Sequence, residues 1–162
     1  MSIESMLLGM TLAEVSLMVK ELSLPAYTAR QIVEWVYGKH VASVDGMTNI
    51  STKARQQIAE KYAVGASHPL RESVSEDGAK KYLFSVSSGN RVEAAYIPDR
   101  DRATLCVSSQ AGCRMGCAFC MTARQGMNGN LTVTDILNQF RSLPEHDKLT
   151  NIVFMGSENY IL

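Results

Sequence analysis

The segment ATLCVSSQAGCRMGCAFC, residues 103–120, contains all four cysteines of the chain. Its first part, residues 103–109, predicts a β-strand, and the glycine-punctuated remainder predicts a loop. Cys106 lies in the predicted strand, whereas the other three cysteines lie in the loop with the spacing C-x3-C-x2-C. The sequence therefore poses two questions, namely which fold surrounds this segment and what chemistry its thiols support.

The residues after the loop predict a helix and a second strand. Apolar residues at i, i+3, i+4 and i+7 predict a helix over residues 132–143, and Thr132-x-x-Asp135 supplies its start. The apolar run over residues 151–155 predicts a strand that is covered on both faces. Together these elements predict one βαβ unit, in which a right-handed crossover joins two parallel strands. Sites in such sheets form at the carboxyl ends of the strands, where the cysteine loop lies.

Two strands are predicted upstream, over residues 81–86 and 91–97, with a Ser-Gly-Asn hairpin loop between them. Because side chains alternate along a strand, Glu93 shares a face with Ala95 and Ile97. A carboxylate beside two apolar neighbours makes Glu93 a candidate site residue, although alternation alone favours a solvated or edge-strand glutamate.

The first 65 residues predict helices. Thr11-Leu-Ala-Glu14 and Thr28-Ala-Arg-Gln31 each have the form of a capping box in front of an apolar helical pattern, with Pro25 between them. A third helix is predicted over residues 51–62, and Gly65 would end it. The pattern therefore predicts a compact three-helix module over residues 1–65.

Composition limits the classes of protein that this chain could represent. It has 162 residues, 46% of them hydrophobic, and no apolar run approaches the roughly 18 residues of a membrane helix. The N-terminal residues lack the pattern of a secretory signal, so we expect a cytoplasmic, reducing location and no membrane partner. Sixteen basic residues balance sixteen acidic ones, which argues against a purely electrostatic nucleic-acid binder but allows a local basic patch.

The spacing of Cys113, Cys117 and Cys120 indicates an iron-sulfur cluster. Three thiolates from one loop can reach three corners of a cubic cluster and leave the fourth iron open to a substrate or cofactor. A zinc site with Cys106 as the fourth ligand is the main alternative, but structural zinc sites favour paired C-x2-4-C motifs. A disulfide fits a reducing compartment less well, and buried unligated thiols fit a glycine-rich loop poorly. Phe119 is compatible with ordinary loop packing or with presenting its backbone and ring to a nucleoside.

Residues 92–139, VEAAYIPDRDRATLCVSSQAGCRMGCAFCMTARQGMNGNLTVTDILNQ, resemble the radical S-adenosylmethionine enzymes. More narrowly, they resemble the RlmN-type dual-specificity adenine-C2 methyltransferases, which modify 23S rRNA and tRNA. The lead-in DRATLC-x-SSQ-x-GC is more specific than the three-cysteine motif alone. The resemblance implies an α/β fold with a helical accessory module that recognises RNA, a β-hairpin, and the first βαβ unit of a radical SAM (β/α) barrel.

The resemblance also implies a role for each matching residue. Cys113, Cys117 and Cys120 would hold a 4Fe-4S cluster whose open iron chelates S-adenosylmethionine, and Phe119 would lie on the adenine side of that cofactor. Cys106 would be the thiol that resolves a covalent enzyme-RNA adduct by forming a disulfide with a methyl-carrying cysteine. Glu93 would be the proton acceptor. An electron donor, 23S rRNA and tRNA would be the partners.

The end of the sequence departs from the family pattern. After NIVFMG the family continues with a Met-Gly-Glu-Pro type segment, whereas this chain reads SENYIL over residues 157–162. We therefore expect an N-terminal portion, divided into regions 1–65, 66–102 and 103–162, that is truncated after the second barrel strand and inactive alone. The alternative is a noncatalytic fragment that binds RNA, an iron-sulfur cluster or zinc.

Overall fold

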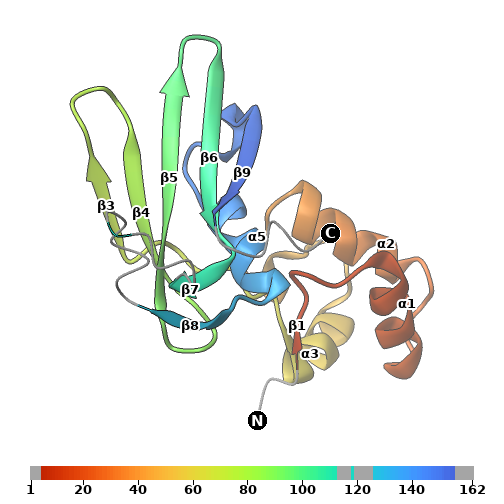
Figure 1. Ribbon diagram of the computed structural model, residues 1–162. Helices are drawn as coiled ribbons and strands as arrows, with labels where there is room; N and C mark the ends of the chain where they lie inside the picture. The colour runs from red at the N-terminus through yellow and green to blue at the C-terminus, as the bar shows by residue number, and fades with distance from the viewer. Residues whose placement is uncertain (1–4, 113–117, 119–125, 156–162) are drawn as a thin grey trace. The chain divides into compact units, whose positions relative to one another are not determined.

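The computed structural model describes residues 5–112, 118 and 126–155. The chain forms two compact units, Met1–Ser67 and His68–Leu162, and each is described here by itself (Figure 1). Helices dominate the first unit and a β-sheet the second, so the predicted mixed α/β class is confirmed. The finer division into regions 1–65, 66–102 and 103–162 stays a prediction.

Helix α1 (Leu12–Glu21) begins at the predicted capping box. The Glu14 backbone N–H donates to the Thr11 hydroxyl at 3.3 Å, and the Thr11 backbone N–H donates to the Glu14 carboxylate at 2.6 Å. The Thr11 backbone N–H, and the Thr11 hydroxyl that donates to the same carboxylate at 2.8 Å, lower the pKa of Glu14 from its ordinary value. The helix buries Val15, Met18 and Val19, whereas Leu12, its first residue, is exposed.

The second predicted capping box, at the start of helix α2 (Thr28–Val33), is wrong. Its N-cap is Tyr27 in helical conformation, without a side-chain hydrogen bond, and Thr28 is buried inside the helix. The reason is an earlier turn, in which the Thr28 N–H already donates to the Pro25 carbonyl at 2.9 Å. The helix continues into the π-helical turn η1 (Glu34–Gly38).

Helix α3 (Thr52–Lys61) starts at Ser51, whose hydroxyl accepts a hydrogen bond from the Ala54 N–H, and it buries Ala54 and Ile58. It follows the short 3-10 helix η2 (Val44–Gly46). The predicted extension of α3 to residue 62 is wrong, because Tyr62–Ala63 forms strand β2. Strand β2 pairs in parallel with β1 (Ser5–Met6), and strands this short carry no alternation that a sequence pattern could reveal.

The second unit is built on a sheet with the order β3-β4-β5-β6-β9 (Figure 1). The strands are β3 (Arg71–Val74), β4 (Lys80–Ser85), β5 (Arg91–Asp99), β6 (Arg102–Ser108) and β9 (Asn151–Met155). The β4–β5 pairing is antiparallel, which confirms the predicted hairpin. The β6–β9 pairing is parallel, with helix α5 (Val133–Arg141) between the two strands in sequence, so the predicted parallel βαβ unit is confirmed.

Hydrogen bonds connect the first turn of helix α5 to the loop between strands β4 and β5. The predicted capping box between Thr132 and Asp135 is present. The Asp135 carboxylate also accepts hydrogen bonds from the Ser87 N–H at 2.9 Å and from the Ser87 hydroxyl at 2.7 Å. Burial acts to raise the pKa of Asp135, but the hydrogen bonds from Ser87 and Thr132 outweigh it and lower the pKa. One carboxylate therefore caps the helix and holds the β4–β5 loop.

The sheet has two different faces. We call the face that packs against α5 the covered face, and it includes Tyr82, Phe84, Ala94, Leu105 and Val107. Ile136 and Phe140 of α5, with Leu143 beyond its end, pack against this cluster. The other face, which we call the open face, carries the alternate residues of the same strands.

The burial predicted for strand β9 is wrong. All five residues of Asn151–Met155 are exposed, whereas the continuous apolar run predicted a strand covered on both faces. Within the described chain β9 is the last strand of the sheet and pairs only with β6, so nothing in that part of the chain covers it.

Two short strands border the cysteine segment where only a loop was predicted. Strand β7 (Gln110–Gly112) directly precedes the segment, and strand β8 (Met127–Asn130) follows it. They pair antiparallel with Gly112 opposite Met127, and Figure 1 shows them beside the end of β6. The pairing brings the two ends of the intervening segment together.

Candidate functional site

Glu93 lies on the open face of β5. Its burial pattern places Val92, Ala94 and Tyr96 inward and leaves Glu93 and Ile97 exposed, so the predicted shared face is confirmed and is the solvent side. The Glu93 carboxylate forms an ion pair with the Lys81 ammonium at 3.2 Å, and the two side chains are 58% and 63% exposed. The carboxylate is therefore accessible to a ligand.

Cys106 lies on the same face of the neighbouring strand. It is a partly buried free thiol on β6, directly opposite Ala95 of β5. Since Glu93 is two residues before Ala95, Glu93 and Cys106 are diagonal neighbours whose backbones lie about 7–8 Å apart. The structure thus brings together two of the predicted site residues, which are 13 positions apart in the sequence.

The carboxyl end of β6 is held in place by a buried glutamine. The Ser108 N–H donates to the Gln139 side-chain oxygen at 2.8 Å, and the Gln139 amide donates back to the Ser108 carbonyl at 2.9 Å. Gln139 is fully buried. The Ser108 hydroxyl in turn donates to the Glu93 backbone carbonyl at 2.6 Å. Helix α5 therefore positions the strand end that carries the open-face residues.

Sequence reasoning did not identify Gln139 as a positioning residue. A signal was present, because Gln139 follows Ile136 by three positions and therefore lies at the edge of the apolar stripe of the predicted helix. A polar side chain at such a position needs a hydrogen-bond partner inside the fold.

The predicted ligand set lies outside the described residues. Cys113, Cys117, Cys120 and Phe119 all fall within residues 113–117 and 119–125, so their assigned roles remain predictions. Over residues 5–112, 118 and 126–155, no group of three His, Cys, Asp or Glu side chains could hold a metal ion. What the structure does show is the ladder of β7 and β8 at both ends of the cysteine segment.

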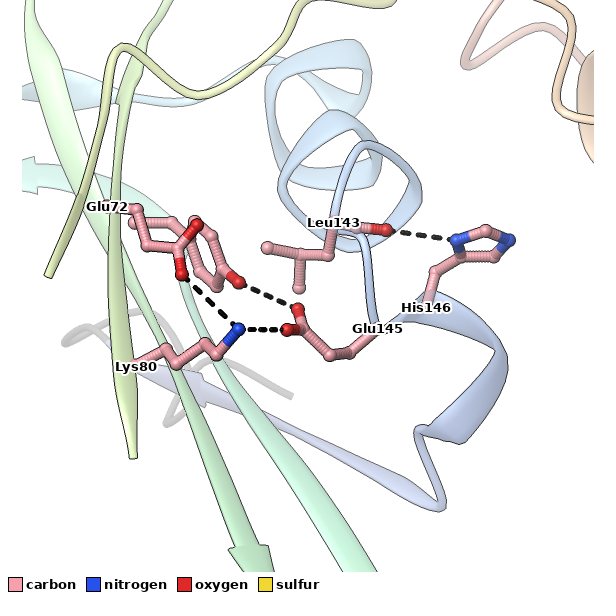
Figure 2. A network of polar contacts seen from close by, with 6 residues as sticks. Glu72, Lys80, Leu143, Glu145 and His146 are labelled. Atoms are coloured by element: carbon pink, nitrogen blue, oxygen red, sulfur yellow. Dashed lines mark hydrogen bonds and ion pairs between the residues drawn. The ribbon is translucent and has the colours of Figure 1, made fainter. Parts of the chain in front are cut away.

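A polar network closes the covered face (Figure 2). Glu145, which follows α5, accepts hydrogen bonds from the Lys80 ammonium at 2.6 Å and from the Tyr82 hydroxyl at 2.7 Å. Glu72 pairs with the same ammonium at 3.2 Å. Beyond Glu145, the 3-10 turn η3 (His146–Lys148) begins with the His146 Nδ1 at 2.9 Å from the Leu143 carbonyl oxygen.

The network shifts the pKa values of its three members. Hydrogen bonds to Glu145 and Glu72 raise the pKa of Lys80 well above its ordinary range. Burial, followed by the bond to Glu145, raises the pKa of Tyr82. Burial acts to raise the pKa of Glu145, but hydrogen bonds from Lys80 and Tyr82 outweigh it and lower the pKa. Lys80, Tyr82 and Glu145 are therefore bonded to one another on the covered side of the sheet.

Comparisons with known proteins agree with this fold. The family described as "Ribosomal RNA large subunit methyltransferase N-terminal domain" matches residues 6–64. A crystal structure of a radical SAM methyltransferase from Sphaerobacter thermophilus superposes with a TM-score of 0.86 and 34% identity, covering 96% of this chain and 49% of that one. None of the helices in the described part of the chain has the length and apolar character needed to cross a membrane.

Curated relatives extend the similarity over most of the chain. A probable dual-specificity RNA methyltransferase RlmN of Bacteroides fragilis is 55% identical over 150 residues, which are 93% of this chain and 44% of that protein. The dual-specificity RNA methyltransferase RlmN of Desulfosudis oleivorans is 44% identical over 134 residues, which are 80% of this chain and 36% of that protein. The chain thus spans less than half the length of these relatives. By sequence and by fold, the chain corresponds to the N-terminal part of RlmN-type radical SAM methyltransferases, and residues 6–64 match that family's N-terminal domain.

Proposed function

We propose that this chain contributes the N-terminal part of an enzyme that methylates carbon 2 of adenine in 23S rRNA and tRNA in the cytoplasm. The observation that supports it is the placement of Glu93 and Cys106 as diagonal neighbours on the open face, beside the end of β6 that leads into the cysteine segment. Strands β6 and β9 would be the first two parallel strands of a (β/α) barrel.

The donor set fits an iron-sulfur cluster. Cys113, Cys117 and Cys120 offer thiolates alone, which are the ligands that such clusters use. Cys106, which pairs with Ala95 and Val153 in the β6 ladder, would not be a ligand, because the three loop thiolates already supply the cluster. When bound, the cluster and S-adenosylmethionine supply the radical chemistry, for which an electron donor is required.

The open-face residues then have separate tasks. The Glu93 carboxylate accepts the proton that leaves carbon 2 of the adenine, and its exposure lets a nucleotide reach it. The Cys106 thiolate forms a disulfide with the sulfur of the methyl-carrying cysteine as the bond from that sulfur to the methylene carbon breaks. The electron pair of the broken bond passes to that carbon, which takes up a proton to become the product methyl group. Because the methyl-carrying cysteine would lie in the remainder of the enzyme, we expect no methylation of RNA by the 162-residue chain alone.

Metal analysis of variants tests the proposal. After anaerobic reconstitution, the wild-type chain should hold about four irons with matching sulfide. Cys113→Ala, Cys117→Ala and Cys120→Ala should each lose the iron, whereas Cys106→Ala, the matched control, should retain it.

A zinc site makes the opposite prediction. It would give about one zinc per chain and would require Cys106 as the fourth tetrahedral ligand. Zinc binding that is lost in Cys106→Ala would therefore overturn the cluster assignment. Formation of 2-methyladenine by the isolated chain would overturn the expectation that methylation requires the remainder of the enzyme.

A further inference from the structure

A pocket of about 240 Å³ opens on the sheet directly beside Glu93. The pocket is lined by six residues of strands β3, β4 and β5, namely Arg71, Ser73, Lys81, Tyr82, Leu83 and Glu93. The polar groups come from three neighbouring strands of one sheet.

Strand register explains why these groups meet. Arg71 lies opposite Leu83, which lies opposite Glu93, so the three form one cross-strand row. The next row contains Ser73, Lys81, Ala95 and Cys106. Residues in such rows share a face, and two strand spacings place the Arg71 backbone about 10 Å from that of Glu93. The basic groups therefore flank the candidate site on the open face.

The charges of the pocket favour an anion. Two cations face one carboxylate, and the guanidinium of Arg71 has no ion-pair partner among the described residues. The Lys81–Glu93 pair is largely exposed, and exposed pairs are worth little, so a phosphate can compete for the Lys81 ammonium. Because the whole chain carries no net charge, binding of a polyanion has to rely on local patches of this kind.

We propose that Arg71, Ser73 and Lys81 bind a backbone phosphate of the RNA next to the nucleotide that Glu93 contacts. This inference rests on the proposed function, because it takes RNA as the ligand. The Arg71 guanidinium can donate two parallel hydrogen bonds to the phosphate, the Ser73 hydroxyl can donate one, and the Lys81 ammonium adds charge. As Lys81 turns to the phosphate, the Glu93 carboxylate becomes free to face the adenine.

Binding of a fluorescently labelled, unmodified tRNA transcript to the full 162-residue chain tests the subsite. Fluorescence anisotropy at several salt concentrations gives the affinity and its salt dependence. Arg71→Gln should weaken binding about tenfold and lower the slope of log K against log salt by about 0.7–0.9. Lys81→Gln should act in the same direction, but it also leaves Glu93 unpaired, so Arg71→Gln is the cleaner variant.

Arg102→Gln is the matched control. Arg102 is exposed at the start of β6, four positions from Cys106, which shares a row with Ser73 and Lys81, and is thus about 13 Å or more along the sheet from the pocket. Its loss should leave affinity and slope near the wild-type values. Both arginines are exposed, and thermal melts by circular dichroism show whether each variant remains folded.

Each outcome of the binding experiment supports or overturns the phosphate subsite. Selective weakening by Arg71→Gln supports the subsite. Equal binding by wild type and Arg71→Gln, or equal loss in Arg102→Gln, overturns the subsite and leaves RNA binding by the chain intact. Absence of tRNA binding by the wild type overturns both the subsite and the RNA part of the proposed function. The iron analysis of the cysteine variants tests the cluster assignment independently of this result.

Discussion

Two consecutive lysines show how the faces of the sheet differ. Lys80 lies on the covered side and donates to Glu145, whose side chain is only 9% exposed. Lys81 lies on the open face and pairs with Glu93, whose side chain is 58% exposed. The residue types and the strand are the same, yet one pair joins β4 to the segment after α5 and the other can be displaced by a ligand. Alternation along a strand thus separates groups that hold the fold from groups that are available for chemistry.

The sharpest test of this difference compares neighbours on β6. Leu105 is fully buried on the covered face, and Cys106 is partly exposed on the open face. Leu105→Ala should lower the free energy of unfolding by about 3 kcal/mol, because it leaves a cavity under α5. Cys106→Ala should lower it by less than about 1 kcal/mol. Urea unfolding of both variants checks this, and similar losses would contradict the assignment of the two faces.

Gln139 tests whether the covered side controls the geometry of the open one. Gln139→Ala removes two hydrogen bonds to Ser108 and should lower the free energy of unfolding by about 2 kcal/mol. Amide hydrogen exchange should become faster at Ser108, which loses the acceptor of its N–H. Unchanged exchange there would show that Gln139 does not position the end of β6.

The pH dependence of stability tests the Glu145 network. The pKa of Glu145 is lowered in the folded chain, so its contribution is present above its ordinary pKa of 4.5 and is lost as the pH falls through the lowered folded value. Glu145→Gln should lower the free energy of unfolding by about 1.5 kcal/mol at pH 7. The difference from wild type should shrink as the pH falls below about 5, as urea titrations at each pH would measure. A constant difference would contradict this origin.

The smallest effect on stability is expected at the open ion pair. Glu93→Gln and Lys81→Gln should each change the free energy of unfolding by less than about 0.5 kcal/mol, because exposed pairs contribute little. In the complete enzyme, however, Glu93→Gln should stop formation of 2-methyladenine, because an amide cannot take up the proton. Digestion of the RNA and chromatography of its nucleosides would measure this. Full methylation by the Glu93→Gln enzyme would remove Glu93 from the proposed chemistry.

Local patterns in the sequence predicted those elements that fold from local contacts. The capping boxes at Thr11 and Thr132 are present because a hydroxyl and a carboxylate three residues later satisfy the first turn of a helix directly. At Thr28 the same pattern failed, because the turn from Pro25 had already started the helix. Strand β3 gave no signal, since all four of its residues are exposed and do not alternate.

The candidate site was only partly predictable, because it depends on contacts between distant residues. Alternation placed Glu93 on a face, and the family resemblance nominated Cys106, but the register that makes them neighbours depends on where β5 ends and β6 begins. The ends were predicted at residues 97 and 103, whereas the paired strands extend to Asp99 and Arg102. Glu145 could not be found in this way, because its partner Lys80 lies 65 positions earlier.

The turn between β5 and β6 has a consequence for how this enzyme family can tolerate insertions and deletions. Asp99 pairs with Arg102, so only Arg100 and Asp101 connect the strands, and Arg100 adopts a left-handed backbone with φ of 47°. A shift of one residue in the pairing register of β5 and β6 would leave both side chains in the protein. It would, however, place Cys106 on the opposite face of the sheet from Glu93. Length changes at this connection should therefore be more harmful to activity than most substitutions within it.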